Sequence, residues 1–157
     1  MDEMVRAATL EDLKSLIRSL DANGVDYVLI GGFALAAHGY QRATTDIDLM
    51  VAGTAEVGTR LKAALMVLPD QAAKGLEPDW FEEGENIRVA DAFVVDLMLN
   101  ANGQTFETLK QHVQIVDVDG MKVRTLSLEG LLLTKTSREA PAFRRGRDSA
   151  GPLGEAG

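Results

Sequence analysis

The sequence predicts a single α/β domain, with a small mixed β-sheet flanked by helices that lie mainly on one face. Segments with a helical period of apolar residues alternate with short apolar runs typical of strands. Of the 157 residues, 46% are apolar and 25% are charged, which is ordinary for a globular protein. We assign residues 1–140 to the domain. Residues 141–157 are rich in Gly and Pro, so we expect a disordered tail.

The first predicted element is a helix over residues 9–22. Its apolar residues recur three and four positions apart and therefore share one face, and Thr9 can cap its first turn. Asn23-Gly24 should end the helix. The apolar run over residues 25–30 predicts the first strand.

Two glycines join that strand to a short predicted helix over residues 33–38, which Gly39 can cap. Gly31 and Gly32 let the backbone turn sharply and let a ligand approach it closely. The N-terminus of the helix offers N–H groups and a positive dipole end to an anion. This stretch therefore predicts a phosphate-binding turn.

Two aspartates lie on the next predicted strand, residues 46–51. Asp46 and Asp48 are two positions apart, so their side chains point to one face, about 7 Å apart along the chain. Like charges held side by side repel unless a cation lies between them, and carboxylate oxygens suit Mg²⁺. The alternative is an edge strand with two solvated acids, although Asp is disfavoured in strands.

The middle of the chain adds a long helix over residues 54–68, which Pro69 should end. Residues 70–86 are acidic and predict a loop, with a short strand near Trp80-Phe81. A further short strand is expected over residues 87–90.

A third acid, Asp96, lies in the middle of the strand predicted over residues 93–99. A lone acid in an apolar strand is costly to bury unless it is paired or bound to a metal. If this strand lies beside the earlier acidic strand, Asp96 joins the two other aspartates. The alternative is that Asp96 pairs with a nearby arginine, such as Arg88. Asp91, at a predicted turn, is a competing third carboxylate.

The last predicted elements are a short helix over residues 104–112 and a hairpin of residues 113–118 and 121–125. Asp119-Gly120 is a typical two-residue hairpin loop. Ser127 should cap a final helix that runs to about Lys135. Its leucines, at positions 128 and 131–133, are expected to bury it.

Composition excludes several classes of function. The absence of Cys excludes disulfides and thiolate metal sites, and two His residues make a zinc site a poor interpretation. A net charge of −8 argues against broad binding to nucleic acid. The N-terminus does not resemble a signal peptide, and no apolar run approaches roughly 20 residues. We therefore expect a cytoplasmic protein without a membrane part.

The glycine pair and the three aspartates together resemble the core of the nucleotidyltransferase superfamily, the family of DNA polymerase beta. The closest resemblance is to its small bacterial branch, the minimal nucleotidyltransferases and AbiEii-type toxin proteins, over roughly residues 8–138. Phe33 departs from the family pattern, in which Ser often occupies or neighbours the second glycine. The positions that match are Gly31, Gly32, Asp46, Asp48 and Asp96.

The resemblance implies a metal-dependent enzyme that moves a nucleoside monophosphate from a nucleoside triphosphate, such as ATP, to an acceptor hydroxyl or amine. Asp46, Asp48 and Asp96 would be both catalytic residues and ligands of two Mg²⁺ ions, with Mn²⁺ as a substitute. The implied nucleotide-binding residues are Gly31, Gly32, Arg42 and Lys135.

The acceptor stays open: an antibiotic, a tRNA end and a protein side chain all fit. The resemblance also implies a role in a toxin–antitoxin pair, with a cognate partner protein, or in resistance. Arg42 could instead pair with Asp46 or Asp48, and Lys135 could be a surface residue favoured by the helix C-terminus. Two rival functions are a nucleotide-binding partner module without turnover and an Asp-rich phosphohydrolase.

Overall fold

A seven-stranded mixed β-sheet forms the centre of the molecule. The structure is a computed structural model that describes residues 5–41, 43–135 and 143–144. The strands are β1 (Val28–Ile30), β2 (Ile47–Met50), β3 (Asn86–Ala90), β4 (Val94–Met98), β5 (Val113–Val118), β6 (Met121–Leu126) and β7 (Phe143–Arg144).

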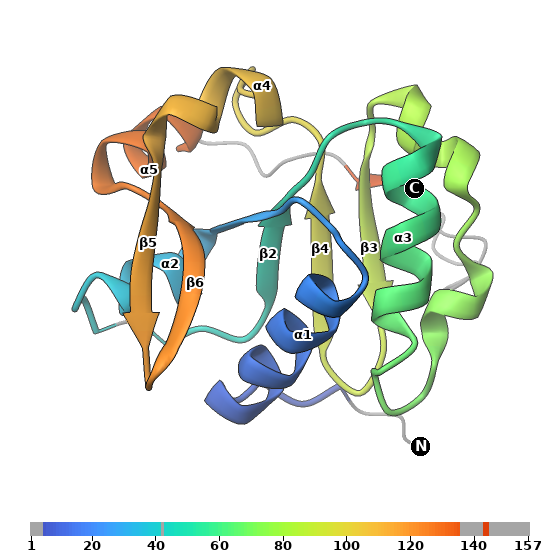
Figure 1. The fold of residues 1–157 in the computed structure, drawn as a ribbon, viewed down its shortest axis with the longest axis horizontal. Helices are drawn as coiled ribbons and strands as arrows, with labels where there is room; N and C mark the ends of the chain where they lie inside the picture. The colour runs from blue at the N-terminus through green and yellow to red at the C-terminus, as the bar shows by residue number, and fades with distance from the viewer. Residues whose placement is uncertain (1–4, 42, 136–142, 145–157) are drawn as a thin grey trace.

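Across the sheet the order is β5-β6-β1-β2-β4-β3-β7 (Figure 1). At the centre, β1 pairs antiparallel with β2 and parallel with β6, and β2 pairs parallel with β4. The outer strands β3 and β5 pair antiparallel with β4 and β6. The prediction of an α/β fold with a mixed sheet is confirmed.

Helices cover both faces of the sheet, so the expectation that they lie mainly on one face is wrong. The α-helices are α1 (Leu10–Ala22), α2 (Gly31–Ala37), α3 (Ala55–Leu65), α4 (Phe106–Leu109) and α5 (Leu128–Thr134). In Figure 1, α1 and α3 lie in front of the sheet and α2 and α5 lie behind it. The central strands β2 and β4 are largely buried on both sides, which requires cover on both faces.

The first helix forms as its sequence predicts. Thr9 and Asp12 make a reciprocal capping box, in which each side chain accepts a hydrogen bond from the backbone N–H of the other. The apolar stripe is at most 1% exposed at Leu13, Leu16, Ile17 and Leu20. This burial anchors α1 on the sheet.

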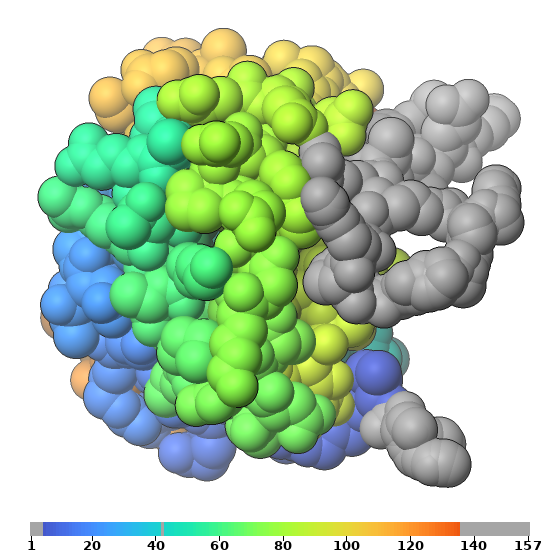
Figure 2. Space-filling model, turned by 90° about the vertical axis from the view of Figure 1, so that its right-hand side faces the viewer, coloured from blue at the N-terminus to red at the C-terminus, as the bar shows by residue number. Residues whose placement is uncertain are grey.

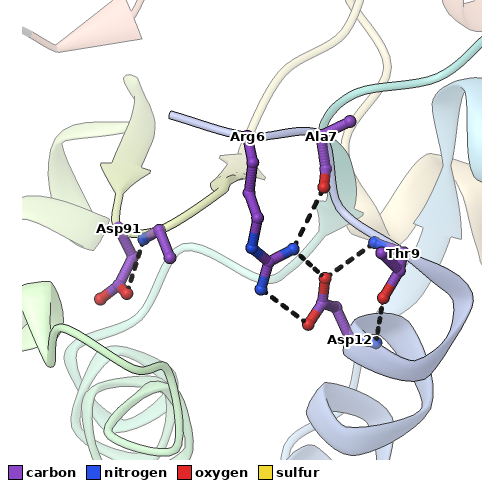
Figure 3. A network of polar contacts seen from close by, with 6 residues as sticks. Arg6, Ala7, Thr9, Asp12 and Asp91 are labelled. Carbon is purple, nitrogen blue, oxygen red and sulfur yellow. Dashed lines mark hydrogen bonds and ion pairs between the residues drawn. The ribbon is translucent and has the colours of Figure 1, made fainter. Parts of the chain in front are cut away.

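Arg6 ties the segment before α1 to the rest of the molecule (Figure 3). Its guanidinium donates to both oxygens of Asp12, at 2.6 and 3.2 Å, and to the carbonyl of Ala7. It also lies 5.1 Å from the centre of the Phe93 ring. The contacts hold the segment against the turn before β4.

The same segment also contacts the loop before β2. The backbone N–H of Ala8 donates to the carbonyl of Thr45 at 2.9 Å, and that of Arg6 donates to the carbonyl of Ala92. Thr45 directly precedes Asp46, so the N-terminal segment helps to set the position of this acid.

Residues 70–86 differ from the prediction of a loop with a short strand. They contain two 3-10 helices, η1 (Ala72–Gly75) and η2 (Pro78–Glu83). Trp80 and Phe81 lie in η2 and are 5% and 0% exposed. Phe81 packs against Gly58 of α3, where a Cβ atom would lie 2.6 Å from its ring. In Figure 2 this segment and α3, both green, form one continuous surface.

The last elements match the prediction except in how α5 is buried. β5 and β6 form the expected hairpin, with Asp119 and Gly120 at positive φ, and η3 (Lys110–His112) follows α4. Of the four leucines in α5 only Leu131 is buried, because consecutive residues on a helix cannot all face the sheet.

In the predicted tail, residues 141–142 and 145–157 lie outside the described residues, so disorder there stays a prediction. The structure differs from it at two residues: Phe143 and Arg144 form β7, which pairs parallel with β3 at Asn86 and Ile87. An exposed sheet edge offers unpaired backbone groups to such a strand. In the described part of the chain, no helix has the length and apolar content needed to span a bilayer.

Candidate active site

Three charged side chains lie in one row across three neighbouring strands. Asp48 of β2 is directly opposite Asp96 of β4. Asp96 is in turn directly opposite Arg88 of β3. Residues opposite each other on paired strands project to the same face, so two carboxylates and one guanidinium meet on the face away from α1 and α3.

Asp96 is held by Arg88 through both of its oxygens. Arg88 Nε donates to Oδ1 at 2.8 Å, and Nη2 donates to Oδ2 at 3.1 Å. The Asp96 side chain is only 5% exposed, whereas that of Arg88 is 47% exposed. The two alternative interpretations of Asp96 are therefore both met: it lies beside Asp48, and it is paired with Arg88.

The surroundings of Asp48 disfavour the ionised form of its carboxyl group. Burial raises its pKa to about 8, and the Asp96 charge, a side-chain hydrogen bond to Asp96 and the Asp46 charge act in the same direction. The Arg88 charge opposes the shift. The hydrogen bond to Asp96 in turn raises the pKa of Arg88. Near neutral pH, Asp48 therefore keeps a proton that a bound cation would displace.

Asp46 lies at a bend just before β2, not within the strand as predicted. Its Oδ1 accepts a hydrogen bond from the hydroxyl of Thr45 at 3.1 Å, and its side chain is 32% exposed. Its Oδ2 lies 3.9 Å from Arg88 Nη2. Asp46 thus reaches the row of charges from its solvent side.

The glycine turn lies directly against Asp48. Gly31 has φ of +73°, a left-handed conformation that favours glycine, and a Cβ atom there would collide with the Asp48 carboxylate. A Cβ atom on Gly32 would collide with the Thr44 side chain. α2 begins at Gly31, two residues earlier than predicted, and Ile30 gives it no side-chain cap. The start of α2 and the acids therefore share one site.

A cleft of about 660 Å³ opens beside this turn, between α2 and α5. Gly31, Gly32 and Lys135, three of the four predicted nucleotide-binding residues, line it. The fourth, Arg42, lies outside the described residues. The other lining residues are Leu35, Tyr40, Leu128, Leu131, Leu132 and Thr134.

Sequence reasoning did not find the apolar wall of this cleft. Tyr40 and Leu132 are 54% and 70% exposed, and the leucines had been expected to be buried. The sequence does contain a signal for this wall, because three consecutive leucines in a short helix cannot all lie on one buried face. His38, close by, is bonded through Nε2 to the carbonyl of Leu126 at 2.8 Å, as expected of a residue that packs rather than reacts.

The donor set around Asp48 fits a divalent cation in part. Within residues 5–41, 43–135 and 143–144, no three His, Cys, Asp or Glu side chains are arranged to hold a metal ion. The Asp96 oxygens are both bonded to Arg88. Asp46 and Asp48 offer hard oxygen donors, and Mg²⁺ is commonly bound by one or two carboxylates with water and phosphate oxygens. Two carboxylates are therefore available to one ion, and Asp96 is available to a second only if Arg88 releases it.

Comparison with known proteins identifies the fold. The sequence matches no protein-family model and no curated protein. The structure is similar to the crystal structure of a proposed nucleotidyltransferase from Thermotoga maritima, with a TM-score of 0.54. The two are 18% identical, over 81% of this chain and 82% of that chain. The chain therefore has the nucleotidyltransferase fold.

Proposed function

We propose that the chain is a metal-dependent nucleotidyltransferase, which moves a nucleoside monophosphate from a nucleoside triphosphate to an acceptor hydroxyl or amine. The observation that carries this proposal is the meeting of Asp48 and Asp96 at the glycine start of α2. The cleft that Gly31, Gly32 and Lys135 line beside these acids supports it further. The shared fold agrees with the same activity.

The acids would hold the metal. Asp46 and Asp48 would hold one Mg²⁺ ion, or Mn²⁺, and Asp96 would take part in holding a second ion. When bound, the two ions would neutralise the triphosphate and favour the ionised form of the acceptor. Asp96 would accept the acceptor's proton, and in the described state both of its oxygens accept hydrogen bonds from Arg88.

The remaining residues would bind the nucleotide. Backbone N–H groups of Gly31 and Gly32 would donate to phosphate oxygens, because no side chain caps this turn. Lys135 and Arg42 would stabilise negative charge that builds up in the transition state. The acceptor oxygen or nitrogen bonds to the α-phosphorus, the bond from that phosphorus to the bridging oxygen breaks, and pyrophosphate leaves.

Incubation with Mg²⁺ and each α-labelled nucleoside triphosphate tests the proposal. We expect pyrophosphate release and transfer of label by the wild type, and neither by Asp48→Asn. The variant should fold normally, because asparagine has the size of the buried, protonated aspartic acid and carries no charge. Equal pyrophosphate release by the two proteins would contradict the assignment of Asp48.

One observation favours a second candidate, a nucleotide-binding partner module without turnover. Arg88 neutralises the third carboxylate, as it would in a site that no longer needs a second ion. The same incubation separates the candidates, because triphosphate binding without pyrophosphate release supports the module.

The acceptor and biological role belong to the proposal as well. An AbiEii-type toxin with a cognate partner protein, or a resistance enzyme, would modify a macromolecule or a small molecule in cells that produce it. Mass spectrometry of cells producing the wild type, but not Asp48→Asn, should show one species heavier by a nucleotidyl group, the mass of a nucleoside monophosphate less one water. Identical spectra would argue against transfer.

A further inference from the structure

Arg88 occupies the space that a cation shared by the acids would need. Its guanidinium bonds to both oxygens of Asp96 and also lies 3.9 Å from Asp46. The positive charge therefore lies between two of the three carboxylates. Arginine is always charged and its planar fork matches a carboxylate, so the protein supplies its own cation at this position.

We propose that Arg88 is the resident counter-ion of the site and that it competes with the second divalent ion for Asp96. The inference rests on the proposed function, since it concerns how the same acids bind metal. The first ion binds Asp46 and Asp48, while the second binds only when Arg88 releases Asp96.

The exposure of the two side chains indicates which one moves. Asp96 is 5% exposed on a central strand, so it cannot leave the site. Arg88 is 47% exposed, and its long side chain can rotate towards solvent. A cation that takes its place compensates the buried carboxylate, so release of Arg88 leaves no unpaired charge in the interior.

The balance of charge sets the order of binding. Once a bound cation has displaced the proton of Asp48, three carboxylates and one guanidinium leave two negative charges, which a single divalent ion neutralises. A second divalent ion then meets a neutral site, so it binds weakly and only as Arg88 departs, and an anion such as a triphosphate would strengthen its binding. Ion occupancy is thereby linked to substrate.

Counting of bound Mn²⁺ by electron paramagnetic resonance, without nucleotide, tests the competition. We expect the wild type to bind one ion tightly, and Arg88→Met to bind the second at least tenfold more tightly than the wild type does. Arg60→Met is the matched control. Arg60 is 48% exposed, and it bonds to Glu56 and to the carbonyl of Gly24, outside the row of charges.

The outcomes separate the two proposals. Equal second-ion affinity in Arg88→Met and Arg60→Met would overturn the role of Arg88 and leave the metal-dependent function standing. Absence of any Mn²⁺ binding in all three proteins would overturn both.

The displacement of Arg88 can also be tested on the wild type, without any variant. The ¹⁵N signal of Arg88 Nε reports its hydrogen bond to Asp96. During titration with Mg²⁺ we expect this signal to stay in place while the first ion binds. It should then move to the chemical shift of solvent-exposed arginines as the second ion binds. A signal that stays unchanged at saturation would contradict the displacement.

Discussion

At the scale of single residues, Asp48 connects the structure of the site to its chemistry. Its carboxyl is buried beside a second carboxylate, and both effects raise its pKa, to about 8. An acid in this environment stabilises the fold when protonated and binds a cation when ionised. The residue would thus link the stability of the protein and the pH to the occupancy of the proposed metal site.

The first prediction concerns the pH dependence of stability without metal. The folded pKa of Asp48 lies above its unfolded value of 3.8, so the folded state retains the proton that the unfolded state loses. The contribution of Asp48 to stability is complete below about pH 4 and is lost as the pH rises towards 8. The slope is at most about 1.4 kcal/mol per pH unit.

Urea unfolding in EDTA at pH 5 to 8 measures this loss. We expect Asp48→Asn to gain in free energy of unfolding relative to the wild type as the pH rises. Saturating Mg²⁺ should remove most of the difference, because it favours the ionised acid. A constant difference between the two proteins over this range would show that the Asp48 pKa is not raised.

At the scale of elements, the junction of β1 and α2 determines how close the backbone comes to the acids. Gly31 is required there both by its positive φ and by the space that the Asp48 carboxylate occupies. The N-terminal segment adds a second support, because Ala8 bonds to Thr45 next to Asp46. The acids are thus positioned by backbone on two sides.

The second prediction compares two glycines at this helix. Gly31→Ala combines a strained φ with a collision against Asp48, and should cost about 2 to 4 kcal/mol of stability and weaken Mn²⁺ binding. Gly39→Ala has a positive φ but nothing within 4 Å of the added Cβ atom. It should cost only about 1 kcal/mol and leave Mn²⁺ binding unchanged. Urea unfolding and Mn²⁺ titration measure both effects, and equal losses would contradict the collision.

At the scale of the whole molecule, the sheet order brings together segments that are far apart in the sequence. β4 pairs with β2 on one side and with β3 on the other, which aligns Asp48, Asp96 and Arg88. β6 pairs with β1 and leads into α5, so that Lys135 reaches the cleft beside Gly31. The cleft and the acids therefore depend on one tertiary arrangement.

The third prediction tests this cleft. Lys135→Ala should weaken binding of a nucleoside triphosphate about tenfold, because one charge contact to a phosphate is lost. Lys62→Ala, in α3 on the opposite face, is the control and should bind as the wild type does. Fluorescence titration with a labelled triphosphate measures the affinity. Equal affinities in the two variants would remove Lys135 from the nucleotide site.

Much of the secondary structure and the choice of candidate acids could be read from the sequence. The α1 stripe with its Thr9 cap and the hairpin at Asp119-Gly120 depend on neighbours in sequence, and both form as expected. Asp96 was a candidate site residue because an acid inside an apolar strand needs a partner. Local patterns gave a wrong prediction where tertiary packing decides the secondary structure. Trp80-Phe81 was expected in a strand but lies in a 3-10 helix that covers α3.

The sequence by itself determined the α/β class, the glycine turn and three acids suited to a divalent ion, because residue type and local periodicity depend only on near neighbours. Only the tertiary structure decided that Arg88 binds Asp96 and that the α5 leucines line a cleft. The physical reason is strand register. Which side chains meet across a sheet depends on the pairing of strands tens of residues apart, and no local pattern records that pairing.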